Sequence, residues 1–148
     1  MSTTAGIGLT MPDGTIKAIY LHWDGYIANG GAGETLAEHY TDWKKVEKLV
    51  SLGFLSSLGA EVEPDPKTPH SWAKPQENVT VAYHRDCGQR LIPARKFKDR
   101  EEYEAEGVGA LSASYLYLFE NGHWLVCHPY GVQREWKKLN DAVNENQD

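Results

Sequence analysis

Two short motifs, His22-Trp23-Asp24 and His84-Arg85-Asp86, each place a histidine two residues before an aspartate at the end of a predicted strand. Residues i and i+2 of a strand share a face, so each histidine would lie beside its own aspartate. If the two strands are neighbours, the four side chains could bind a divalent metal or supply an acid–base pair to a nucleotide or phosphate ligand, with Tyr26 and Arg85 adding contacts. The alternative, which we favour, is that each histidine packs at a strand end and each aspartate begins a turn.

Other candidate chemistry is weaker. The run Gly30-Gly31-Ala32-Gly33 precedes a predicted helix, where backbone N–H groups could hold an anion, but Glu34 would repel it, so we interpret the run as a flexible connector. Cys87 lies close to the second motif, yet neighbours on one turn rarely orient as nucleophile and base. Cys127 is expected in the core. We therefore assign no catalytic residue, metal ligand or cofactor, and favour a non-enzymatic protein.

Contacts with a partner are a separate question. Tyr26 and Trp72 fall in predicted loops, where a large aromatic side chain either anchors the loop or meets a ligand or partner. We expect most other aromatic residues, Trp23 included, to pack in the core. A basic stretch could meet a phosphorylated ligand, although a solvated face explains it more simply; it comprises Arg85, Arg90, Arg95, Lys96 and Lys98.

The elements that would position these residues follow from hydrophobic periodicity and turn signals. Hairpins are predicted over 6–10 with 15–23, where Pro-Asp-Gly forms the turn, and over 114–120 with 123–128, where Asn-Gly does. Helices are predicted over 34–40, from an N-cap at Thr41 to Gly53, over 99–106 closed by Gly107, and over 134–143. Val79–His84 is a predicted strand and Leu91–Pro93 a short edge segment.

This order of elements predicts a single α+β domain over residues 1–148, with an antiparallel sheet of hairpins and helices packed on one face. Four of the seven prolines fall in 60–78, which we expect to be a surface loop with Trp72 as its one anchor. Residues 144–148 are expected to fray.

Composition limits the class of partner. The chain has 148 residues, 15 Lys+Arg and 21 Asp+Glu, for a net charge of −6. Direct binding to nucleic acid is not expected, because neutralising phosphates needs positive charge. Two cysteines suit a reducing compartment, and with no membrane segment or secretory signal in the sequence we expect a cytoplasmic protein.

Five blocks of the chain resemble a family of small, mostly uncharacterised phage and prophage proteins: Gly14–Tyr26, Thr35–Tyr40, Val46–Leu58, Ala82–Asp86 and Tyr117–Trp124. The resemblance implies an accessory gene product acting in the cytoplasm of a bacterial host.

Our leading hypothesis is a binding protein that modulates a host protein, for example an inhibitor of a bacterial defence system, of the anti-CRISPR or another kind. The residues expected to contact a ligand or partner are His22, Asp24, Tyr26, His84, Arg85, Asp86 and Trp72. Two alternatives remain open: a small-molecule site that binds or cleaves a nucleotide, and a structural or virion-associated protein that pairs with copies of itself.

Overall fold

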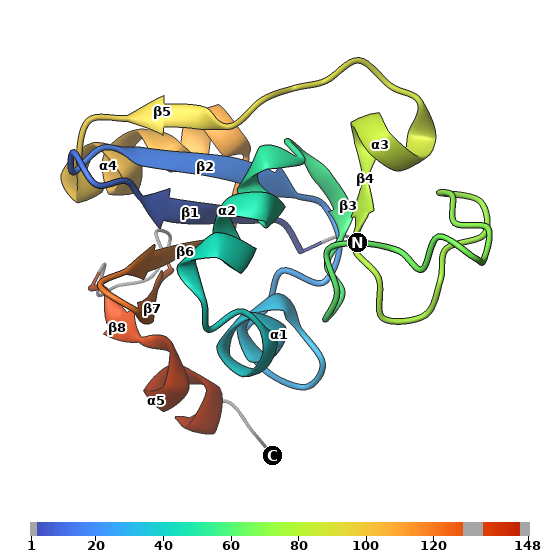
Figure 1. Ribbon diagram of the computed structural model, residues 1–148. Helices are drawn as coiled ribbons and strands as arrows, with labels where there is room; N and C mark the ends of the chain where they lie inside the picture. Colours follow the sequence, from blue (N-terminus) through green and yellow to red (C-terminus); the bar gives the residue numbers. More distant parts are fainter. Residues whose placement is uncertain (1–2, 129–134, 146–148) are drawn as a thin grey trace.

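The computed structural model describes residues 3–128 and 135–145, which are arranged around one eight-stranded sheet (Figure 1). The expected α+β class is confirmed. The strands are β1 (Ala5–Thr10), β2 (Ile16–Leu21), β3 (Leu55–Ser57), β4 (Val81–Ala82), β5 (Arg95–Phe97), β6 (Tyr115–Glu120), β7 (His123–Cys127) and β8 (Lys137–Lys138). The helices are α1 (Ala32–His39), α2 (Trp43–Ser51), α3 (Tyr83–Cys87), α4 (Arg100–Leu111) and α5 (Leu139–Glu145).

The sheet runs in the order β4-β3-β2-β1-β6-β7-β8, and β5 pairs with the first half of β2. Both predicted hairpins form, as β1–β2 and β6–β7. The expected all-antiparallel arrangement is wrong, because β1 pairs with β6 and β2 with β3 in parallel. The hairpins lie side by side through their first strands, which run in the same direction. An alternating pattern indicates which side chains face a core, but not which strands become neighbours.

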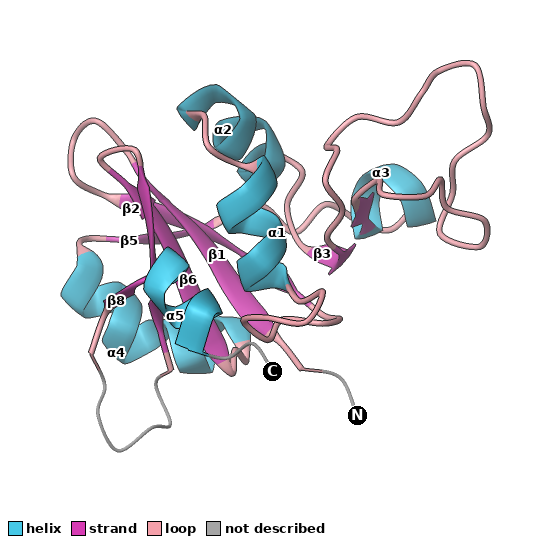
Figure 2. Cartoon of the chain, turned by 90° about the horizontal axis from the view of Figure 1, so that it is seen from below, coloured by secondary structure: helices cyan, strands magenta, loops and turns pink. Residues whose placement is uncertain are grey.

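Helices cover both faces of the sheet, whereas the sequence predicted helices on one face only. Buried residues of α1, α2 and α5 form one core cluster, and those of α4 belong to a second cluster on the opposite side (Figure 2). Strand β1 explains why a helix also covers the second face. Its Ile7 and Leu9 point to one face of the sheet, whereas Gly6 and Gly8, which have no side chain, lie on the other face. A Cβ on Gly8 would lie 3.1 Å from the ring of Tyr103 in α4, so the bare glycine face is what admits this helix.

The start of α2 and the end of α4 differ from expectation. The N-cap of α2 is Asp42 rather than Thr41, since the Asp42 carboxylate accepts the Lys45 N–H at 3.2 Å. Helix α4 continues past Gly107, where it was predicted to end, as far as Leu111. Gly107 lies against the buried side chain of Leu116, so it permits close packing instead of terminating the helix.

The middle of the chain departs most from the prediction. The strand predicted over Val79–His84 is reduced to β4, because Tyr83 begins α3. No strand forms over Leu91–Pro93, and the edge strand β5 begins at Arg95 instead.

The C-terminal helix is shorter than predicted. It begins at Leu139, after β8, while Arg134, its predicted first residue, lies outside the described residues. Of the tail predicted to fray, residues 144 and 145 end α5, and 146–148 lie outside the described part. Across residues 3–128 and 135–145, none of the helices combines the length and apolar character that crossing a bilayer requires.

Candidate functional site

A buried ionic cluster joins α3 to the loop over residues 60–78, and Asp86 lies at its centre. The Asp86 side chain is only 3% exposed. Arg85 donates to it through Nε at 2.9 Å and Nη2 at 3.0 Å, and the Ala82 N–H donates at 2.8 Å. Burial alone would raise the pKa of Asp86, but the Arg85 and Ala82 hydrogen bonds and the Arg85 charge outweigh it and lower the pKa. Asp86 is therefore a charged structural anchor whose oxygens are already occupied.

The cluster reaches into the loop through His70 and Arg85. His70 Nε2 lies 3.4 Å from Asp86 Oδ2, and both side chains are 3% exposed. His70 Nδ1 accepts the Gln76 N–H at 3.0 Å, so the proton of the neutral ring is on Nε2, facing the carboxylate. Arg85 Nη1 also donates to the Val62 carbonyl at 2.7 Å. Neither nitrogen of His70 is available as a catalytic base.

The Gln76 side chain braces the same loop from within. Its Oε1 accepts the Asp65 N–H at 2.9 Å, and its Nε2 donates to the carbonyls of Asp65 at 2.9 Å and Thr68 at 2.7 Å. We call residues 60–78 the braced loop. Trp72 was expected to be its one anchor; instead His70 and Gln76 hold the loop.

Trp72 is presented to solvent by this arrangement. The backbone N–H of Trp72 donates to the backbone carbonyl of Asp86 at 3.1 Å, which ties this part of the loop to α3, while the residue is 59% exposed. Figures 1 and 2 show the braced loop extending from the body of the domain beside α3. A large exposed aromatic residue on a loop whose backbone is held in place is typical of recognition loops on rigid scaffolds.

The shared metal site considered for the two His-x-Asp motifs, which was not the favoured interpretation, is not formed by the described residues. His22 follows β2, and its Nδ1 lies 2.6 Å from the Tyr20 hydroxyl. The second motif lies on α3 instead of at a strand end, and His84 Nδ1 donates to the Gln89 carbonyl at 2.8 Å. Asp24 is exposed on a left-handed turn, with φ of 57°. Among the described residues, no three His, Cys, Asp or Glu side chains gather as metal ligands.

The glycine run before α1 forms a hydrogen-bonded connection where a flexible one was expected. The N–H groups of Gly33 and Glu34 donate to the carbonyls of Tyr26 and Ile27, at 3.2 and 2.7 Å. A Cβ on Gly31 would collide with Tyr26, so glycine is needed for this close approach. Since these first amides of α1 already have partners, they are not free to hold an anion. Tyr26 is half-buried and anchors the connection.

Neither cysteine has the features of a nucleophile. Burial, and to a smaller extent the charge of Asp86, raises the pKa of the Cys87 thiol, which is the opposite of activation. Cys127 is buried in the core, as expected.

A second exposed apolar surface lies at the end of β2. The ring centroids of Tyr20 and Phe54 are 5.5 Å apart, those of Tyr20 and His22 5.9 Å, and those of His22 and Trp23 4.6 Å. Trp23 ends this row and is 46% exposed, so its predicted core position is wrong. The row adjoins the segment after α3, because the Phe54 N–H donates to the Ile92 carbonyl at 3.1 Å.

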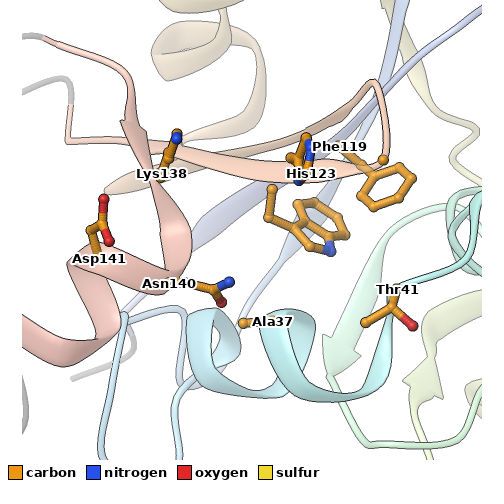
Figure 3. Close-up of a pocket in the computed structure, with 9 residues that line it drawn as sticks. Ala37, Thr41, Phe119, His123, Lys138, Asn140 and Asp141 are labelled. Atoms are coloured by element: carbon orange, nitrogen blue, oxygen red, sulfur yellow. The ribbon is translucent and has the colours of Figure 1, made fainter.

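Sequence reasoning did not find the pocket shown in Figure 3. It encloses about 360 Å³ between β7, the start of α5 and the end of α1. Phe119 and Trp124 supply its apolar wall, and Lys138 and Asp141 place opposite charges at its side. No motif marks it, because its lining comes from three separated parts of the chain.

Comparison with protein-family models, with curated proteins and with solved structures found no match to this chain.

Proposed function

We propose that this chain is a non-enzymatic binding protein that recognises another protein, with Trp72 of the braced loop at the centre of the contact. The observation that carries the proposal is the combination at Trp72 of 59% exposure with a backbone held by a buried ionic cluster.

The energetic argument has two parts. Tryptophan is among the residues most enriched at the energetic centres of protein interfaces, and leaving it in water forgoes the free energy of burying it. Fixing a loop before binding reduces the conformational entropy lost on association. The bracing by Arg85, Asp86, His70 and Gln76 is such a device. Trp23, Leu91 and Ile92 are further exposed apolar side chains of the domain.

The identity of the partner rests on the resemblance to phage and prophage proteins. It supports a host protein as the partner, a component of bacterial defence being one such target, and the bacterial cytoplasm as the place of action. The −6 net charge is compatible with a partner whose own surface is basic.

The test is affinity capture from bacterial lysate with the tagged 148-residue chain at micromolar concentration. We expect one stoichiometric protein on the wild type and at least a tenfold loss with Trp72→Ala, the loss typical of an interface hot spot. Lys67→Ala is the matched control, since Lys67 is exposed on the same loop, and it should capture as the wild type does. Recovery of no partner, or equal recovery with Trp72→Ala, would overturn the proposal.

A further inference from the structure

A second pocket lies between α2 and the part of the sheet where β2 meets β5. It encloses about 430 Å³. Leu9, Met11 and Val50 contribute apolar surface, Lys17 and Lys48 contribute positive charge, and Glu47 contributes a carboxylate. An apolar pocket with a few polar groups is the usual form of a small-molecule site.

A pair of lysines on neighbouring strands adds to the positive charge beside this pocket. Lys17 of β2 lies directly opposite Lys96 of β5. Their neighbours Ile16 and Phe97 are buried on the α4 side, so by alternation the two lysines face the α2 side, where the pocket lies. Like charges directly opposite one another destabilise a sheet. An anion bound between them would remove that cost.

No carboxylate in the described chain neutralises these lysines through an ion pair. Lys17, Lys48 and Lys96 form no salt bridge with any described residue. The charge of Lys96 contributes to the lowered pKa of Asp13, but hydrogen bonds from Thr15 are the larger cause there. The positive charge at the pocket is therefore available to a ligand.

We propose that this pocket binds a small amphiphilic carboxylate, with the anionic group near Lys17 and Lys48 and the hydrocarbon part over Leu9, Met11 and Val50. A single negative charge fits best, because Glu47 offsets part of the lysine charge. Lysine acts as a point charge without the bidentate fork that arginine offers a phosphate. The site is separate from the braced loop and does not depend on the function proposed above.

The probe is decanoate below its micellar concentration, added to the 148-residue chain and followed by titration calorimetry and by thermal unfolding. We expect saturable binding with Kd below about 1 mM, a rise in melting temperature, and weakening with added salt. Decanol, which has the same chain without the charge, should bind about tenfold more weakly. Lys17→Gln should weaken decanoate binding about fivefold and, without ligand, raise the melting temperature by relieving the repulsion from Lys96.

Two control variants complete the design. Lys44→Gln removes an exposed lysine from α2 that does not line the pocket, and Trp72→Ala alters only the braced loop; both should bind decanoate like the wild type. Non-saturable binding, equal binding of decanol, or unchanged affinity in Lys17→Gln would each overturn the proposal, whatever the result of the lysate capture.

Discussion

Asp86 carries a charge where water is nearly excluded, so its neutral replacement gives a direct test of the ionic cluster. Asp86→Asn should lower the free energy of unfolding by about 3 kcal/mol, because Arg85 loses its buried counter-charge. The folded-state pKa of Asp86 is lowered, so its stabilisation is present above the unfolded pKa of about 4 and is lost as pH falls below it. Urea unfolding at neutral and acidic pH measures both effects.

Glu63→Gln is the matched control for that experiment. Glu63 also faces Arg85, at 4.0 Å, but its side chain is 64% exposed, so the substitution should cost less than about 1 kcal/mol. The Asp86→Asn variant should also be cleaved within the braced loop under mild proteolysis, which the control should resist. Equal stability of the two variants would show that the cluster does not hold the loop.

The site could be predicted only in part from single residues. Arg85, Asp86 and Trp72 were singled out from the sequence, but as ligand contacts beside His84. His70 and Gln76 were missed, because a polar side chain inside a proline-rich run gives no periodic signal. Their roles follow from contacts with residues up to 16 positions away along the chain. A spacing rule for strands also could not indicate that Tyr83 would begin a helix.

At the scale of the elements, the glycine face of β1 decides where α4 lies. Gly8→Ala should destabilise the fold by about 1–3 kcal/mol, because the added Cβ would approach the Tyr103 ring to 3.1 Å in a packed interface. Gly109→Ala is the control: it lies in α4 with nothing within 4 Å of an added Cβ, and should stabilise by about 0.5–1 kcal/mol. Chemical denaturation measures both. A neutral Gly8→Ala would contradict the close approach of α4.

Elements with a strong local signal were predictable, and those defined by distant contacts were not. The Asn121-Gly122 turn needs two positive φ values, which these residues adopt readily. The β6–β7 hairpin could therefore be predicted from residues that are close together in the sequence. By contrast, β4 and β8 have two residues each and exist only through pairing with β3 and β7. Because Gly6 and Gly8 add nothing to the hydrophobic pattern of β1, the sequence did not indicate that α4 packs on that face.

At the scale of the whole molecule, buried tyrosine hydroxyls connect the layers. Tyr103 of α4 donates to the carbonyl of Tyr117 at 2.9 Å, and Tyr117 donates to the carbonyl of Gly25 at 2.7 Å, across the sheet from α4. Tyr40 donates to the Gly59 carbonyl at 2.6 Å. Because each bond joins separate elements, we expect the layers to unfold together.

Alkaline titration tests this connection between layers. Burial raises the pKa of Tyr40 to about 12 and that of Tyr103 and Tyr117 well above the usual value. Since the folded pKa values are the higher ones, the stabilisation is complete below the unfolded pKa of about 10 and is lost as pH rises beyond it. These three side chains should therefore ionise only as the protein unfolds, which tyrosinate absorbance and circular dichroism would show as coincident transitions. Tyr117→Phe should remove one of the late-ionising groups and cost about 1–2 kcal/mol, because the Gly25 carbonyl loses its donor. Ionisation of all tyrosines before any loss of secondary structure would show that these hydroxyls are open to solvent and do not link the layers.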